Sequence, residues 1–139
     1  MRNKELIRHN INNLVRAGFD VESANDYSWV CVRGIDLPGS YGSWTLKGLT
    51  VTTTSALIDM PFDFPMSPPG VGISHPTRAI HLPLILYNGK LMNDFYMCKH
   101  DPWYWFCFQQ MSWDSRNDNL LTLVALIEAS ISDRVRGLM

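Results

Sequence analysis

Residues 27–60 read YSWVCVRGIDLPGSYGSWTLKGLTVTTTSALIDM and decide the fold class of this chain. The first part, YSWVCVRGI (27–35), is rich in the β-branched and aromatic residues that favour strands. Glycine, proline and serine crowd residues 36–43, which predicts a turn. Residues 44–60 supply one or two more strands, with a threonine run typical of a half-exposed sheet surface. Strands joined in this way predict an antiparallel meander of about four strands rather than alternating βαβ units.

Helical periodicity flanks this region on both sides. The first pattern predicts a helix near residues 3–17 that ends at Gly18, because glycine tolerates the left-handed conformation found after many helices. Its apolar residues recur at helical spacing on one face: Leu6, Ile7, Ile11, Leu14 and Val15. The sequence therefore places an amphipathic helix before the sheet.

The second helical pattern follows the sheet, near residues 118–133. Asn117, Asp118 or Asn119 can cap it, and leucine, valine and isoleucine occupy more than half of its circumference. A helix of this kind is expected to be largely buried against the sheet. Helix, strands and helix in this order predict an α+β fold, with residues 1–139 forming a single domain.

Composition and charge exclude several classes of function. The chain has 46% hydrophobic and 18% charged residues, which is a globular composition. Its formal net charge is −1, so no basic field is available to hold a phosphate backbone. No apolar run approaches the roughly 20 residues needed to cross a bilayer. We therefore expect neither nucleic acid nor a membrane as a partner.

The cysteines indicate the cellular compartment. Cys31, Cys98 and Cys107 form an odd set without CxxC pairs, which fits a reducing cytosol better than a disulfide framework. The N-terminal segment lacks an apolar core followed by a small-residue cleavage site. We expect a cytoplasmic protein.

A proline-dense stretch, PFDFPMSPPGVGISHP (61–76), interrupts the strands, and a regular central strand across 61–70 is not expected. Four features in this order resemble the ubiquitin-conjugating enzyme family. They are SWVCVRGIDLPGS (28–40), FPMSPP (64–69), Val71 with Ile73 in a short strand, and Trp113 shortly before the leucine-rich helix. The resemblance covers roughly residues 5 to 132. It implies a UBC-like fold.

The sequence differs from the family's usual pattern in three ways, and these differences indicate which branch of the family it resembles. A His-Pro-Asn tripeptide precedes the catalytic cysteine in the family, whereas HP (75–76), HLP (81–83) and HDP (100–102) here all lack the asparagine. The stretch before Cys107 is longer than in eukaryotic members. Because the sequence stops at Met139, we expect a truncated C-terminus, without the helices that usually follow. These traits resemble the divergent bacterial branch of the family, which is commonly associated with antiphage defence.

The activity implied by the resemblance is cysteine thioester acyl transfer. Such an enzyme accepts a ubiquitin-like modifier from an activating enzyme and passes it to an amine of a target protein. The implied partners are thus a modifier, an activating enzyme and target amines, with no cofactor and no metal. In the family the first helix commonly docks the activating enzyme, which makes the cations of this segment candidate contacts: Arg2, Lys4, Arg8 and Arg16.

Cys107 is the first candidate for the nucleophile. It lies six residues before Trp113 in an extended-looking aromatic stretch, near the spacing that the family uses. In a strand, Phe106 and Phe108 point to the face opposite Cys107, so that the thiol is directed away from the aromatic pair. His100 and Asp101 lie upstream and are suited to orient a water or stabilise charge near the thiol.

Cys98 is the rival nucleophile, because Lys99 and His100 beside it would lower a thiol pKa. Cys31 lies mid-strand and is expected in the core. Zinc binding by Cys98, His100 and Cys107 does not follow a recognisable ligand spacing. A second interpretation is a non-catalytic UBC-like binding module that holds a modifier or partner protein, and the missing asparagine favours it.

Overall fold

The computed structural model describes residues 2–38, 44–46, 48–73, 77–78, 104–105 and 113–136. Within these ranges the chain forms a helix, a series of strands and a second helix, which confirms the predicted α+β class. The elements are α1 (Lys4–Arg16), β1 (Asp20–Ser23), β2 (Trp29–Asp36), β3 (Trp44–Leu46), β4 (Leu49–Val51), β5 (Thr53–Asp59), β6 (Gly70–Ile73), β7 (Thr77–Arg78), β8 (Tyr104–Trp105) and α2 (Leu120–Arg136).

The main sheet has the strand order β1-β2-β5-β6-β8, and each neighbouring pair is antiparallel. The run β1, β2, β5 and β6 confirms the predicted meander of four strands, to which the two-residue β8 adds an edge. Between β2 and β5 the chain forms the β3–β4 hairpin, which joins β7 in a second, three-stranded sheet. Residues 44–60 therefore carry three strands, where one or two were expected.

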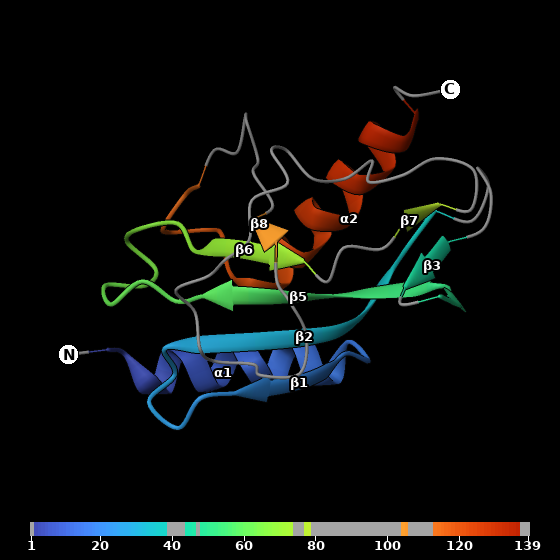
Figure 1. The fold of residues 1–139 in the computed structure, drawn as a ribbon. Helices are drawn as coiled ribbons and strands as arrows, with labels where there is room; N and C mark the ends of the chain where they lie inside the picture. Colours follow the sequence, from blue (N-terminus) through green and yellow to red (C-terminus); the bar gives the residue numbers. More distant parts are fainter. Residues whose placement is uncertain are drawn as a thin grey trace.

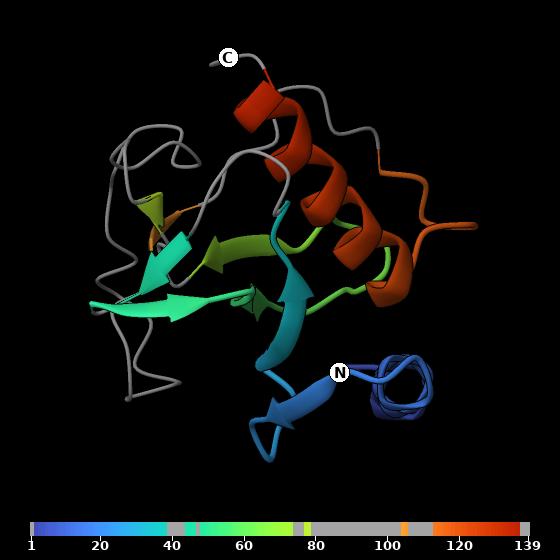
Figure 2. The same cartoon turned by 90° about the vertical axis from the view of Figure 1, so that its right-hand side faces the viewer.

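Both helices cover the same face of the main sheet (Figures 1 and 2). The core lies in this layer because the apolar stripes of the helices meet the alternate residues of β2 and β5 that point toward them. Its fully buried members include Ile7, Leu14, Val30, Val32, Ala56, Ile58, Leu120, Leu123, Ile127 and Ile131. The apolar face of α2 is buried, whereas Leu121 and Ala125 are exposed, so the helix is buried on one face rather than largely buried as expected.

Local signals fix the ends of α1 where the sequence predicted them. Asn3 caps the first turn, since its side-chain oxygen accepts a hydrogen bond from the backbone N–H of Leu6 at 3.1 Å. Gly18 follows the helix with φ +99°, a conformation that a residue with a Cβ rarely adopts. The same freedom is used at Gly34 (φ +94°), where a bulge shifts the register between β2 and β5.

Within the described ranges, neither helix is long and apolar enough to cross a membrane.

Candidate functional site

The proline loop, residues 61–69, connects β5 to β6 without forming a strand of its own, as the proline pattern predicted. Phe64 anchors it, with its side chain 3% exposed in the core. The Phe64–Pro65 peptide bond is cis. Phe62 and Met66, on either side, are 61% and 69% exposed. The loop thus buries Phe64 and Pro69 and exposes two large apolar side chains, with the exposed Asp63 between Phe62 and Phe64.

Trp113 ties the proline loop to the segment that leads into α2. Its indole Nε1 donates a hydrogen bond to the carbonyl oxygen of Pro65 at 2.7 Å. Its ring lies 6.1 Å from that of Phe64, centroid to centroid, with the two planes tilted by 48°. Tilted aromatic pairs at this separation are favourable beyond their area burial. Two motifs that lie far apart in the sequence are therefore in direct contact.

The Trp113 loop, residues 113–119, is held in shape by its own hydrogen bonds. The Asp114 carboxylate accepts hydrogen bonds from the backbone N–H of Arg116 at 3.0 Å and from the amide of Asn117 at 2.7 Å. These donors hold the pKa of Asp114 below its ordinary value, the Arg116 N–H most strongly. The backbone N–H of Asp114 in turn donates to the Asp118 carboxylate at 2.7 Å.

The first turn of α2 is capped twice. Asn119 and Thr122 form a reciprocal pair, in which each side chain accepts a hydrogen bond from the other's backbone N–H, at 2.9 and 2.8 Å. Asn119 is one of the three residues that the sequence offered as a cap. The backbone N–H of Leu120 donates to Asn10 Oδ1 on α1 at 2.8 Å.

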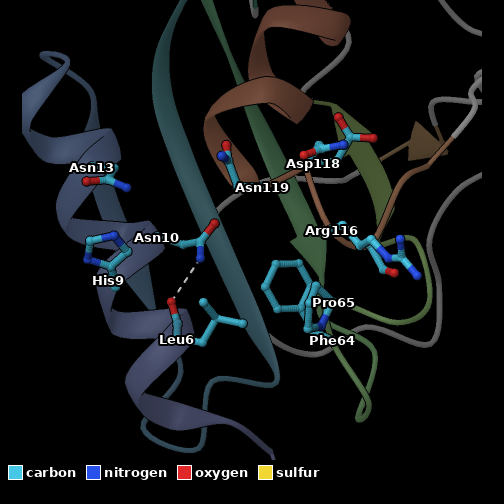
Figure 3. Close-up of a pocket in the computed structure, with 11 residues that line it drawn as sticks. Leu6, His9, Asn10, Asn13, Phe64, Pro65, Arg116, Asp118 and Asn119 are labelled. Atoms are coloured by element: carbon cyan, nitrogen blue, oxygen red, sulfur yellow. Dashed lines mark hydrogen bonds between the residues drawn. The ribbon is translucent and has the colours of Figure 1, made fainter.

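A groove of about 230 Å³ lies where α1, the proline loop and the Trp113 loop meet (Figure 3). Its apolar residues are Leu6, Phe64 and Pro65. Its polar residues are His9, Asn10, Asn13, Ser115, Arg116, Asn117, Asp118 and Asn119. The described lining of the groove is therefore mainly polar, with three apolar side chains among its residues.

The four basic residues expected to contact a partner differ in their surroundings. Lys4 and Arg8 are exposed one helical turn apart on α1, and Arg16 is exposed in its last turn. The Arg8 Nε donates to the Tyr27 hydroxyl at 3.4 Å, and this contact raises the pKa of the guanidinium. Arg2 instead donates to the carbonyl oxygen of Met60, the residue before the proline loop, at 2.8 Å.

The candidate catalytic residues Cys107, His100 and Asp101, and the rival nucleophile Cys98, lie outside the described residues. The described neighbour of Cys107 is β8, whose Trp105 pairs with Gly72 at the edge of the main sheet. Cys31 is fully buried on β2, in agreement with its expected place in the core. In the described part of the chain, no three His, Cys, Asp or Glu side chains gather as a possible metal site.

Sequence reasoning missed Asn10, which is 4% exposed and joins the two helices. Its amide also donates to the Leu6 carbonyl oxygen at 2.9 Å. A signal was available, because Asn10 lies three residues after Ile7 and four before Leu14, which places it on the apolar face of the predicted helix. A polar residue on a buried face needs a hydrogen-bond partner.

Comparisons with protein families, with curated proteins and with solved structures found no match to this chain.

Proposed function

We propose that this chain is a bacterial ubiquitin-conjugating-like enzyme that acts in an antiphage defence system. The observation that carries the proposal is the hydrogen bond from Trp113 to Pro65. It joins the proline element to the tryptophan, two of the four features that carry the resemblance, although 48 positions separate them. The chain between them contains both candidate cysteines.

The architecture supports the proposal in a second way. An N-terminal helix, an antiparallel meander and a C-terminal helix occur in the order that the resemblance implies. The strand β8 pairs with β6 two positions before Cys107 in the sequence. Pairing with β6 fixes the position of β8, the described strand nearest to Cys107 in the sequence. Reactive groups commonly lie on segments that a rigid scaffold positions.

The proposed reaction has two steps. The Cys107 thiolate attacks the thioester carbonyl carbon that joins the modifier to the activating enzyme, and the activating enzyme's thiolate leaves. A target amine then attacks the new thioester, forms the amide C–N bond and displaces the Cys107 sulfur, which takes up the proton that the amine loses. His100 and Asp101 are assigned to charge stabilisation near the thiol. On that assignment His100→Ala slows transfer to the amine by roughly 100-fold.

The activating enzyme is proposed to dock on the exposed face of α1, which carries Lys4, Arg8 and Arg16, together with the outer residues of the proline loop, Phe62 and Met66. These five residues are the docking surface. It combines exposed cations with exposed apolar side chains, and association surfaces often combine charges that guide encounter with apolar residues that hold the complex.

A thioester assay tests the proposed function. The purified chain is mixed with ATP, a candidate activating enzyme and a candidate ubiquitin-like protein, and the products are separated without reductant. The proposal predicts an adduct with the mass of chain plus modifier that disappears on addition of dithiothreitol. Stable non-covalent binding of the modifier with no adduct would instead identify a binding module.

A further inference from the structure

Arg2 contacts the proline loop and the residue before it. A side chain that only contacted a partner protein would not need these contacts within the chain. Its guanidinium donates to the Met60 carbonyl oxygen at 2.8 Å, at the point where β5 passes into the loop. The same guanidinium lies over the ring of Phe62, with 5.1 Å between its central carbon and the ring centroid. One side chain thus holds both the backbone at the start of the loop and the exposed ring next to it.

The electrostatic surroundings of Arg2 strengthen this arrangement. Asp59, the last residue of β5, is partly buried, and desolvation raises the pKa of its carboxyl, while the charge of Arg2 acts in the opposite direction. Arg2 also helps to lower the pKa of Asp26 in the β1–β2 turn, as a smaller contribution beside the Ser28 hydrogen bonds. The positive charge of Arg2 therefore favours the ionised form of two carboxyl groups of the same chain.

The position of Arg2 along the chain is fixed as well. Asn3 follows it as the cap of α1, and the Arg2 carbonyl oxygen accepts from the backbone N–H of Lys4 at 3.0 Å. Arg2 therefore directly precedes the capped end of α1. A side chain that begins at α1 and ends on Phe62 connects the two parts of the docking surface.

We infer that Arg2 is a positioning residue that fixes Phe62 and the start of the proline loop beside α1, rather than a direct contact to the partner. The inference rests on the proposed function where it concerns docking, but the clamp itself is a property of the free chain. Lys4, Arg8 and Arg16 then remain the cations of the docking surface.

Limited proteolysis of the free protein tests the clamp. Chymotrypsin accepts aromatic residues in its hydrophobic specificity pocket, and Phe62 is followed by Asp63, whereas the bond after Phe64 is protected by Pro65. Native-state cleavage after Phe62 reports local opening of the loop. Arg2→Gln removes one hydrogen bond and the cation over the ring, so cleavage there should rise roughly tenfold. Arg2→Lys keeps the charge and should give a smaller increase.

Arg16→Gln is the matched control, because it removes the same charge from the other end of α1. It should leave cleavage after Phe62 unchanged. An equal increase in Arg16→Gln, or no increase in Arg2→Gln, would overturn the inference. So would faster cleavage at all sites together with a lower urea midpoint, since that would show global destabilisation.

The docking role has its own readout in the loading reaction. Arg2→Gln and Phe62→Ala should each raise the KM for the activating enzyme with kcat unchanged, and the double variant should be no worse than Phe62→Ala alone. Faster proteolysis with an unchanged KM would overturn the positioning role. Because the proteolysis uses the free chain, failure of the proposed enzyme activity would not be mistaken for failure of the clamp.

Discussion

The indole Nε1 of Trp113 lies 2.7 Å from the carbonyl oxygen of Pro65, and the hydrogen bond that it donates fixes the segment before α2 against the proline loop. Phe64, beside Pro65, is buried in the core that α1 and α2 share with the sheet. The hydrogen bond therefore links a loop, the core and the start of a helix. Its removal should lower the free energy of unfolding of the whole domain.

Trp113→Phe should lower the free energy of unfolding by about 1–2 kcal/mol, because the ring is retained in part while the partly buried Pro65 oxygen loses its donor. Urea unfolding followed by circular dichroism measures the change. Trp29→Phe is the control, since Trp29 is half-buried on β2 and no described hydrogen bond involves its indole. Equal losses in the two variants would show that ring volume, and not the hydrogen bond, matters at Trp113.

Asn10 provides a second test of how the helices are joined. Asn10→Ala should lower the unfolding free energy by about 2 kcal/mol, because the Leu120 N–H remains buried without an acceptor. Asn12→Ala, on the exposed face of the same helix, has the same change in helix propensity and should be neutral or slightly stabilising. Chemical unfolding of both variants measures the two unfolding free energies. If Asn10→Ala is as stable as Asn12→Ala, Asn10 does not join the helices energetically.

Asp59 should make the domain less stable as the pH rises. Burial raises its pKa in the folded state, so the native chain binds more protons than the unfolded chain between the two values. The unfolding free energy then falls as the pH increases through that range. Asp59→Asn should therefore stabilise the domain at neutral pH. The gain should vanish below the unfolded-state value of about 3.9, where the carboxyl is protonated in both states.

Asp114 should show the opposite dependence. Its pKa is lowered by the Arg116 N–H and the Asn117 amide, so its contribution to stability is complete above the unfolded-state pKa and is lost as the pH falls through the folded-state value. Asp114→Ala should destabilise the domain at neutral pH and much less in acid. Thermal unfolding across a pH series measures both aspartates, and parallel curves for Asp59→Asn and Asp114→Ala would contradict the account.

The elements with strong local signals were predictable from the sequence. The apolar residues of α1 and of α2 recur at helical spacing, because each helix packs one face on the core. Gly18 marked the end of α1, because it takes the positive φ that follows the helix. The β-branched and aromatic residues of 27–35 predicted β2, which the structure places at Trp29–Asp36. In contrast, β1 was missed because Asp20–Ser23 has one apolar residue and forms a strand through its pairing with β2.

The candidate site was predictable only in part. The sequence identified the proline loop and Trp113 as separate features. It did not predict the hydrogen bond between them, because a contact across 48 positions depends on tertiary packing and not on local spacing. Arg2 was grouped with Lys4 and Arg8 by charge alone, and its contacts with Met60 and Phe62 depend on where β5 ends. Cys107, His100, Asp101 and Cys98 stay predictions, because they lie outside the described residues.

Charge reversal on α1 tests the docking surface. Lys4→Glu combined with Arg8→Glu should slow loading from the activating enzyme roughly tenfold by weakening encounter, and the effect should shrink as salt is added. The neutral pair Lys4→Gln and Arg8→Gln should fall between. Tyr27→Phe removes the Arg8 hydrogen bond without changing charge and serves as the control. Unchanged loading in the reversed variant would reduce these residues to solubilising charges.

The most direct measurement is thioester loading of the cysteine variants, with the adduct identified by its mass and by its sensitivity to dithiothreitol. The account predicts loading of the wild type, Cys31→Ser and Cys98→Ser. Cys107→Ser should give either no adduct or a dithiothreitol-resistant oxyester, because a hydroxyl without an adjacent base is a much weaker nucleophile than a thiol. A dithiothreitol-sensitive adduct that survives Cys107→Ser and disappears with Cys98→Ser would contradict the assignment of Cys107. Absence of any adduct in the wild type would contradict the enzyme itself.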